Sequence, residues 1–405
     1  MKKALNFLVL FICLSTLKVK ALDLNVSSKN VIMYNLDNNE ILFEKEDNTK
    51  IQIASLTKIM TAIVTLDRIN DLDQQVIITY DDLKGLAEDN LVTAGFTIGE
   101  AVTYRDLLYG LLLPSGADAA AALSRTVAGN KEEFVILMNE KAKELKLNNT
   151  NFSNPVGLDD ENNYSTAKEV SMLFNYALKN ENFKKIITTS EYTTSDGKIS
   201  FKSTIQNNAK KYEIEVPYIL GGKTGTTDGA GLCLASIAKE NDVNYMLVTL
   251  GAPYDKKRPH HIEDAKTIYD YFIQNYSNQK IVDKKIPYKI LKTVYLKEDK
   301  IKLYPKEDII KYLPNDYDKN DVKLKYEGVD EVSIFTDKKL GTLKIFYKED
   351  LLKEEKVLLK TKVNFSFSKF FKQNIIYIIL IVFILLLIII KKKQSIKHKK
   401  SYEYS

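Results

Sequence analysis

Ser55 and Lys58 stand three residues apart in the stretch ASLTKIM, which begins at Ala54. In a helix this spacing places both side chains on one face, so the lysine amine can take the proton of a nucleophilic serine hydroxyl. Spacing alone is weak support, because this lysine-rich chain contains seven Ser-x-x-Lys sites. A catalytic role for Ser55 must therefore rest on other segments of the chain as well.

Other candidates for a catalytic base are scarce. The histidines are His260 and His261, which are adjacent, and His398 near the C-terminus. A Ser-His-Asp triad would have to use one of the adjacent pair, which we interpret instead as a solvated loop or the start of a helix. The sequence contains no His-Glu-x-x-His pattern of a zinc hydrolase. A hydrolase would need another base, and lysine can serve when burial and neighbouring cations lower its pKa.

Two further segments support Ser55. In LLLPSGADAA, Ser115 follows Pro114 at an expected helix break. In LGGKTGTTDGAGL, Lys223-Thr224-Gly225 lies in an expected strand between glycines, where a substrate backbone could approach closely. In this order the three motifs resemble those of the penicillin-binding protein and serine β-lactamase superfamily. Within it, about residues 25–276 look like the low-molecular-mass D-alanyl-D-alanine carboxypeptidases, and NTNFSNPVGLDDENNYSTAKEV adds to the likeness.

The resemblance implies a role for each matching side chain. Ser55 would attack the carbonyl of the terminal D-Ala–D-Ala bond of a peptidoglycan stem peptide, and Lys58 would accept its proton. Ser115 would relay a proton to the departing D-alanine. Lys223 and Thr224 would bind the terminal carboxylate, which explains a preference for a free C-terminus.

The strand that carries Gly225 would also complete the oxyanion hole. The two donors of the oxyanion hole would be the backbone N–H group of Ser55 and that of Thr226, which follows Gly225 in the strand. Water would then hydrolyse the acyl-enzyme, whereas β-lactams, which imitate D-Ala–D-Ala, would acylate the same serine and stay attached. The resemblance implies neither a cofactor nor a metal.

Ala117 departs from the family pattern, in which the second motif usually ends in asparagine. That amide normally contacts the catalytic lysine and the substrate, so its loss predicts a slower enzyme. Asp118 is next in sequence but points in another direction on a helix, and we do not expect it to substitute. Two alternatives remain: a weakly active or non-catalytic cell-wall-binding protein, and a β-lactamase. A convincing Glu-x-x-x-Asn segment, which would position a deacylating water in a β-lactamase, is missing.

The elements that must hold these residues indicate an α+β catalytic domain at 22–278. A hairpin around Asp37-Asn38-Asn39 precedes a helix that begins near Ser55. Further helices are expected in TYRDLLYGLLLPSGADAAAALSRTVAG, KEEFVILMNEKAKELKL and IEDAKTIYDYFIQNY, and strands in PYILGGKTGTT, GLCLASIAKE and NYMLVTLGA. Strands at both ends with helices between them predict helices packed on an antiparallel sheet. The resemblance implies the transpeptidase fold shared by penicillin-binding proteins and β-lactamases.

The rest of the chain predicts export and membrane anchoring. Residues 1–21 have the form of a signal peptide. Residues 279–365 alternate apolar and polar residues between charged turns, which indicates a small all-β domain. An uncharged apolar run predicts a transmembrane helix at 374–390, and the basic tail 391–405 is expected to stay in the cytoplasm by the positive-inside rule. The catalytic body would then be held outside the cell membrane.

The net charge of +6 comes from the two ends of the chain. The signal peptide carries +4 and the tail +5, which leaves the body with a net charge of −3. We therefore expect no nucleic-acid partner. After removal of the signal peptide only Cys233 remains, so no intrachain disulfide is possible.

Overall fold

The computed structural model describes residues 22, 24–360 and 362–402. The expected signal peptide at 1–21 lies outside the described residues. The chain forms two compact units, the first ending at Gln274 and the second beginning at Asn275.

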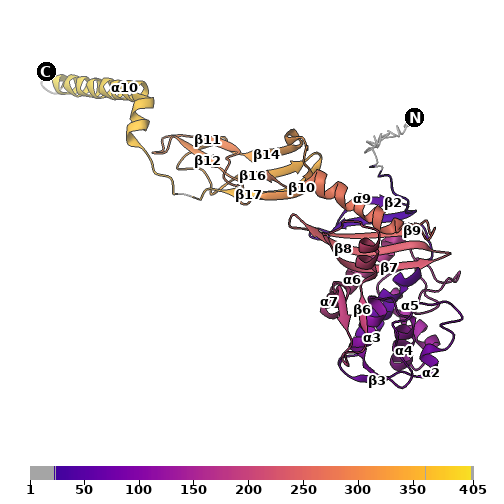
Figure 1. Ribbon diagram of the computed structural model, residues 1–405. Coiled ribbons are helices and arrows are strands. Elements are labelled where there is room, and N and C mark those ends of the chain that lie inside the picture. Colours follow the sequence, from indigo (N-terminus) through magenta and orange to yellow (C-terminus); the bar gives the residue numbers. More distant parts are fainter. Residues whose placement is uncertain (1–21, 23, 361, 403–405) are drawn as a thin grey trace, which may run out of the picture. The chain divides into compact units, whose positions relative to one another are not determined.

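The first unit is built on a five-stranded antiparallel sheet with the strand order β2-β1-β9-β8-β7 (Figure 1). Its strands are β1 (Asn30–Asn35), β2 (Glu40–Lys45), β7 (Ile219–Thr227), β8 (Gly231–Glu240) and β9 (Val243–Ala252). The β1–β2 hairpin comes from the start of the unit and the other strands from its end. Pairing of β1 with β9 joins them, so the sheet closes only through a contact that is long-range in sequence.

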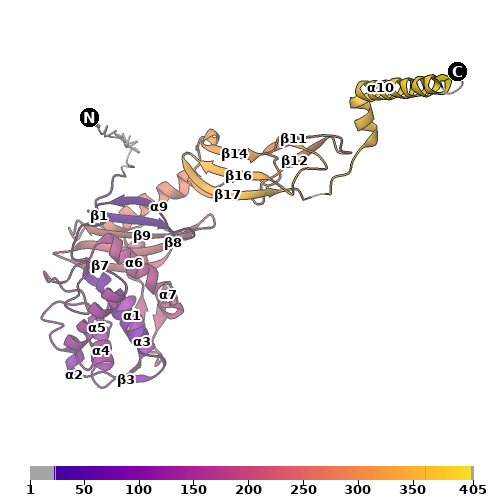
Figure 2. The ribbon, with the colours of Figure 1, turned by 180° about the vertical axis from the view of Figure 1, so that it is seen from behind.

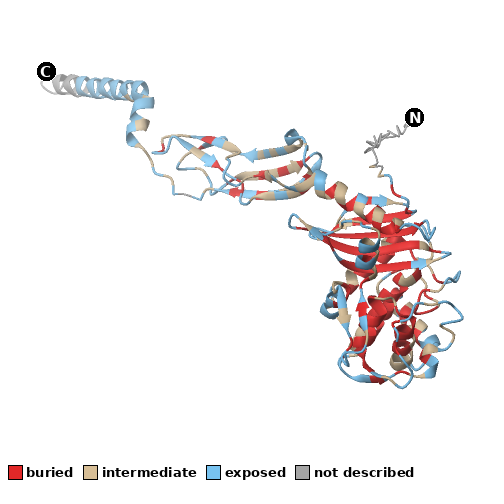
Figure 3. Ribbon diagram, viewed as in Figure 1, coloured by how far each residue is buried: buried red, intermediate tan, exposed pale blue. Residues whose placement is uncertain are grey.

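Helices cover one face of the sheet. The longer ones are α1 (Thr57–Leu66), α3 (Tyr104–Leu112), α4 (Ala117–Ala128), α5 (Lys131–Glu144) and α6 (Ala167–Ala177). All of α1 from Thr57 to Thr65 is buried, as expected for a helix surrounded by other elements. Figure 3 shows the buried residues gathered between the sheet and this helical layer, where Ile32 and Val248 of the sheet join the helices in one core.

The opposite face of the sheet is covered by α9 (His260–Asn275). Ala235 belongs to the core on the helical-layer side, so the next residue, Ser236, faces the other way. Its carbonyl accepts a 3.2 Å hydrogen bond from the hydroxyl of Tyr269 on α9. Figure 2 shows the unit from behind, with α6 and α7 below the sheet. Smaller elements complete the unit: α2 (Tyr80–Leu83), α7 (Glu181–Ile187), α8 (Thr204–Lys211), β3 (Gln75–Ile77), β4 (Ala101–Thr103), β5 (Glu191–Thr193) and β6 (Ser200–Lys202).

The second unit begins with a small β-structure. Its strands are β10 (Tyr276–Val282), β11 (Lys289–Thr293), β12 (Lys300–Leu303), β13 (Ile309–Pro314), β14 (Val322–Gly328), β15 (Glu331–Val332), β16 (Lys339–Tyr347) and β17 (Asp350–Leu358). They enclose a small core that includes Leu291, Leu296 and Leu343. These short strands, separated by charged turns, form the small all-β domain that the alternating sequence pattern predicts.

The same unit ends in the long helix α10 (Phe367–Tyr402). The part Phe367–Gln394 is long and apolar enough to cross a membrane, and it contains the predicted span 374–390. Its apolar side chains are exposed rather than packed in a protein core. The predicted fold class, an α+β domain followed by a small all-β domain and a C-terminal apolar helix, is confirmed.

Candidate active site

Ser55 lies where a turn becomes a helix. The 3-10 turn η1 (Ala54–Leu56) leads directly into α1, and Ala54 has a positive φ of 46°. One turn further along, Lys58 Nζ donates a 3.0 Å hydrogen bond to Ser55 Oγ. The hydroxyl and the amine therefore approach each other as their spacing predicts, with the serine partly exposed and the lysine behind it.

The amine of Lys58 is held in a buried site. The residue is only 3% exposed, and Nζ donates a second hydrogen bond, of 2.7 Å, to the carbonyl oxygen of Val156. Burial lowers the pKa of Lys58 from its ordinary 10.5 to about 7, against the opposing effect of the negative charge of Asp118. A large fraction of this amine is thus neutral near pH 7 and able to accept a proton.

The Val156 carbonyl is positioned by the loop Asn154–Leu158. Asn154 Oδ1 accepts hydrogen bonds of 2.7–3.3 Å from the N–H groups of three successive residues, Val156, Gly157 and Leu158. On the side facing α1, Thr61 Oγ1 donates a 2.7 Å bond to the carbonyl of Pro155, next to Val156. One asparagine thus folds the loop, and two side chains of α1 bind its carbonyls.

Two glycines let neighbouring segments approach the turn that carries Ser55. Gly157 has φ of +87°, and a Cβ built there would lie 2.0 Å from the carbonyl oxygen of Ala54. A Cβ on Gly225 of β7 would lie 3.0 Å from the backbone nitrogen of Ser55. The Ser55 turn is therefore packed between this loop and β7, which places the third motif beside the first.

The other residues of the third motif are divided between the interior and the surface. Lys223 is fully buried, and its Nζ donates a 2.7 Å bond to the carbonyl of Thr224. Burial, and then the positive charge of Lys58, lower the pKa of Lys223 well below its usual value. The Thr224 hydroxyl lies 2.7 Å from that of Thr204, and the side chain of Thr226 is exposed.

The second motif lies in the break between α3 and α4. Ser115 is partly exposed and has a positive φ of 72°, and Ala117 is the first residue of α4. The carboxylate of Asp118 accepts bonds of 2.7–3.2 Å from the N–H groups of residues 94–96. Asp118 is thus occupied in anchoring that loop. This is in keeping with the expectation that Asp118 does not replace the missing asparagine, which stays a prediction.

A pocket of about 500 Å³ connects the second motif with the loop that holds Lys58. Ala117 and Val156 both line it, together with apolar groups such as Leu86 and Leu158. The small side chain of Ala117 therefore lies in the same pocket as the residue whose carbonyl binds the lysine amine.

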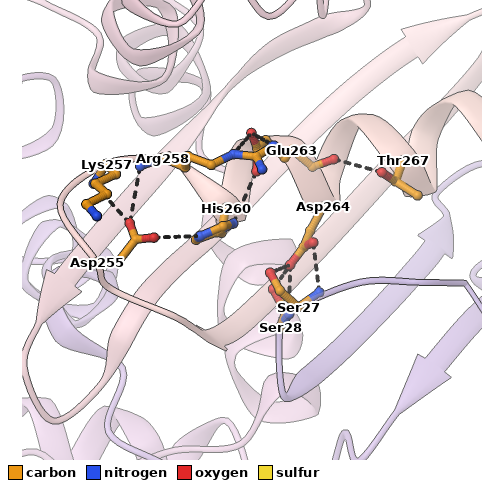
Figure 4. Close-up of polar contacts among 9 residues, drawn as sticks. All are labelled: Ser27, Ser28, Asp255, Lys257, Arg258, His260, Glu263, Asp264 and Thr267. Carbon is orange, nitrogen blue, oxygen red and sulfur yellow. Dashed lines mark hydrogen bonds and ion pairs between the residues drawn. The ribbon is translucent and has the colours of Figure 1, made fainter.

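The two histidines lie at the start of α9, where His260 makes polar contacts (Figure 4) and the ring nitrogens of the buried His261 have no hydrogen-bond partner within the described part of the chain. His260 is partly buried, with Nδ1 3.1 Å from Glu263 and Nε2 3.4 Å from Asp255. Asp264, from the same helix, binds Ser28 near the N-terminus of the unit. Burial lowers the pKa of His261 to about 4. Among the residues that the structure describes, no hydrogen bond links either histidine to the Ser55 site, and no group of three or more acidic, histidine or cysteine side chains could hold a metal ion.

Sequence reasoning missed the loop that contains Asn154 and the contact of Lys58 with Val156. The segment Asn154-Pro155-Val156-Gly157 has turn-forming residues, which could have indicated a tight loop. Its place against Lys58, almost a hundred residues away, could not be read from spacing.

Comparison with known proteins gives the family. The model of the D-alanyl-D-alanine carboxypeptidase family, Peptidase S11, matches residues 16–254. D-alanyl-D-alanine carboxypeptidase DacF of Bacillus subtilis is 30% identical over 376 residues, which cover 89% of this chain and 94% of the relative. DacC of Escherichia coli is 32% identical over 58% of this chain and 59% of its own length.

Solved structures show the same fold. The Streptomyces K15 DD-transpeptidase aligns with a TM-score of 0.55 and 30% identity, covering 61% of this chain and 97% of that one. Penicillin binding protein 5 of Haemophilus influenzae aligns with a TM-score of 0.60 at 22% identity, covering 85% and 99%. With the family match over more than half its length, the chain belongs to the D-alanyl-D-alanine carboxypeptidases of the Peptidase S11 family.

Proposed function

We propose that the chain is a serine-type D-alanyl-D-alanine carboxypeptidase that removes the terminal D-alanine from peptidoglycan stem pentapeptides through an acyl-enzyme at Ser55. The observation that carries the proposal is the 3.0 Å hydrogen bond between Ser55 Oγ and the buried amine of Lys58. An amine with a pKa of about 7 is a competent general base at neutral pH. The family supplies the substrate class.

In acylation, an ester bond to Ser55 Oγ replaces the peptide C–N bond, and the hydroxyl proton is passed on to the leaving amine. Lys58 takes the hydroxyl proton as Ser55 Oγ attacks the carbonyl carbon of the penultimate D-alanine. The backbone N–H groups of Ser55 and Thr226 stabilise the oxyanion, each donor contributing about 3–4 kcal/mol. The tetrahedral intermediate collapses, the C–N bond breaks, and Ser115 relays the proton to the amine of the leaving D-alanine. Water, deprotonated in the same way, hydrolyses the ester and restores Ser55.

Recognition of a free C-terminus is assigned to the third motif. The Thr224 hydroxyl can donate a hydrogen bond to the terminal carboxylate. The Lys223 amine is buried and bonded to the carbonyl of Thr224, and the negative charge of a bound carboxylate would favour its protonated form. Gly225 keeps β7 close to Ser55, so that the carboxylate site and the nucleophile stay in register.

We assign the task of the missing asparagine oxygen to the main chain. The Val156 carbonyl accepts a 2.7 Å hydrogen bond from Lys58, and Asn154 fixes its direction. Lys58 therefore keeps an acceptor for its protonated form although Ala117 offers none. The substrate-facing NH₂ group of an asparagine has no such replacement, and the expectation of a slower enzyme stands on this part alone.

The anchor proposal follows from α10. We propose that this helix crosses the cell membrane once, with the basic tail in the cytoplasm and the catalytic unit outside. The support is the exposed apolar surface of Phe367–Gln394 and the lysines that follow Ile390.

The test uses Ser55→Ala, which removes the nucleophile, and Ser277→Ala as a matched control from another Ser-x-x-Lys site. Fluorescent penicillin labelling and D-alanine release from a pentapeptide should both be lost in the first variant and kept in the second. Labelling of Ser55→Ala at the normal rate would refute the assignment. Rapid hydrolysis of penicillin by the wild-type chain, without stable labelling, would instead favour a β-lactamase, and labelling without D-alanine release a non-catalytic relative.

A further inference from the structure

The first turns of α10 are fixed to one end of the β-structure. The hydroxyl of Tyr295 and the side-chain amide of Asn374 share hydrogen bonds of 2.8 and 3.2 Å. Lys369 Nζ donates a 2.8 Å bond to the carbonyl of Leu296. The ring of Tyr295 packs edge-on against Phe370, with 5.0 Å between centroids. The membrane-proximal part of the helix and the Tyr295 loop are thus one piece.

The turn Ser333–Thr336 lies at this same end. β15 runs parallel to β11, and Val294 N–H donates a 2.8 Å bond to the carbonyl of Val332, directly before the turn. Ser333 N–H bonds to Thr336 Oγ1 at 2.8 Å, which keeps the turn tight. Such a turn can hold exposed side chains outward with little conformational freedom to lose.

Two apolar side chains project from this turn. Phe335 is 88% exposed and its neighbour Ile334 is exposed as well. Phe367 and Phe371 at the start of α10 are also exposed. Scattered apolar residues are normal on a surface, but these gather where the chain turns into an apolar helix. Lysines at positions 297, 338, 362 and 372 lie near them in sequence, together with Glu298 and Asp337, while Lys369 is paired with Asp299.

The length of the helix sets the depth of this end. The uncharged run Ile375–Ile390 spans about 24 Å as a helix, whereas the hydrocarbon layer is about 30 Å thick. Flanking lysines such as Lys372 and Lys391 can reach the headgroups, so the uncharged run is long enough to span. Asn374, directly before this run, then lies at the boundary, and the Tyr295 hydroxyl bonded to it lies at the level of the lipid headgroups.

We propose that the Ser333–Thr336 turn is a second membrane contact, which inserts Phe335 and Ile334 into the headgroup–acyl boundary of the leaflet that α10 enters. The partner is a phospholipid surface with anionic headgroups, which suits the surrounding lysines. This contact rests on the proposed anchor and goes beyond it, because it fixes the β-structure on the membrane surface rather than leaving it on a free stalk.

The test places a polarity-sensitive fluorophore on single cysteines of the chain from residue 22 onward, which lacks Cys13, in vesicles of phosphatidylcholine and phosphatidylglycerol. Cys233 is buried and does not compete for labelling. The probe goes at Phe335→Cys, at Ile379→Cys within the span, and at Ile286→Cys as the control. Ile286 is 64% exposed in a turn before the opposite end of β11.

We expect the probe at 335 to be quenched by lipids that carry a nitroxide near the headgroup and to be protected from aqueous iodide. The control at 286 should remain fully open to iodide, and the probe at 379 should be quenched by deep nitroxides. Iodide quenching at 335 equal to that at 286, with 379 in the bilayer, would overturn the second contact and leave the anchor intact. Water exposure at 379 would overturn the anchor, and the second contact with it.

Discussion

Lys58 meets the two conditions that a lysine base requires, because its amine is buried and hydrogen-bonded to the Ser55 hydroxyl, the proposed nucleophile. The same amine also binds a main-chain carbonyl, so its proton, once accepted, has a defined position. Two properties of this residue can therefore be tested separately: the protonation state of the Lys58 amine, and the carbonyl acceptor to which that amine is bonded.

The pH dependence of acylation should report the protonation state of Lys58. With a pKa of about 7, Lys58 is protonated at lower pH and cannot take the serine proton. The penicillin acylation rate of the free enzyme should rise with pH to a plateau with a midpoint near 7, and fall by about tenfold for each pH unit below it. Stopped-flow labelling measures the profile, with circular dichroism to show that the fold persists. A rate that stays level between about pH 5 and pH 9 would exclude Lys58 as the base.

The role of the Val156 carbonyl as the acceptor for Lys58 is tested by Asn154→Ala combined with Ala117→Asn. Loss of Asn154 releases the loop and misdirects the Val156 carbonyl, so acylation should slow by about tenfold or more. If the Val156 carbonyl replaces an asparagine oxygen, Ala117→Asn in the Asn154→Ala background should recover much of the lost acylation rate. It should also return the midpoint of the pH profile towards that of the unchanged chain. Asn139→Ala is the control, because Asn139 bonds to Phe152 at the start of the segment but not to Val156. Equal losses from Asn154→Ala with alanine or asparagine at 117 would argue against the replacement.

Sequence reasoning reached Ser55 and Lys58 because helical periodicity places them on one face and because the other two motifs single out this site among seven. It could not reach Asn154 or Val156. Their part in the site depends on where a loop folds back onto α1, and no local rule encodes a contact over that separation. Ala117 was visible as a departure, whereas the carbonyl that faces Lys58 in its place was not.

At the scale of elements, the position of Ser55 depends on how closely a loop and a strand pack against one short turn. Ala54 and Gly157 both have positive φ, and the two backbones meet with no room for a side chain. The geometry at Ser55 is thus fixed by tertiary packing as much as by the start of α1.

Gly157→Ala should separate this packing from simple backbone strain. The added Cβ would overlap the Ala54 carbonyl, so the Ser55 turn must move, and a shift of about 1 Å can cost about a hundredfold in rate. Gly197→Ala is the matched control, since Gly197 has φ of +77° but no atom within 4 Å of the new Cβ. Both variants should lose stability, measured by thermal unfolding, but only the first should lose penicillin labelling. Equal labelling rates in the two would show that the turn does not need this close approach.

Most elements with strong patterns were predicted from the sequence, although the amphipathic helix α6 was not. The β1–β2 hairpin, the buried helix α1 and strands β7 to β9 follow alternating or helical apolar patterns. Helix α8 was missed, because it is short, largely polar and buries only Ile205. The pairing of β1 with β9 needed the resemblance to a known fold, since strand order is not written in periodicity.

At the scale of the whole molecule, the chain links a catalytic unit to a single apolar helix. Protease added to intact cells should digest the catalytic unit, while an antibody epitope placed after Lys400 should stay protected until the membrane is opened. Cleavage of the epitope in intact cells, with the catalytic unit spared, would reverse the proposed orientation. Truncation before Ile375 is the companion control, and should release a protein that still labels with penicillin, because α10 contributes no catalytic group.

The buried lysines have a thermodynamic consequence for the first unit as a whole. The unfolded chain holds the proton of Lys58 up to pH 10.5, whereas the folded one releases it near pH 7. Between these values the unfolded state binds more protons, so the free energy of unfolding rises with pH across that window. Below pH 7 the full destabilisation from this one group remains, on the order of 5 kcal/mol. This is a large part of the net stability of an ordinary domain. The rest of the core, from α1 to the central strands, must be stable enough to offset the loss of hydration of the protonated Lys58 amine.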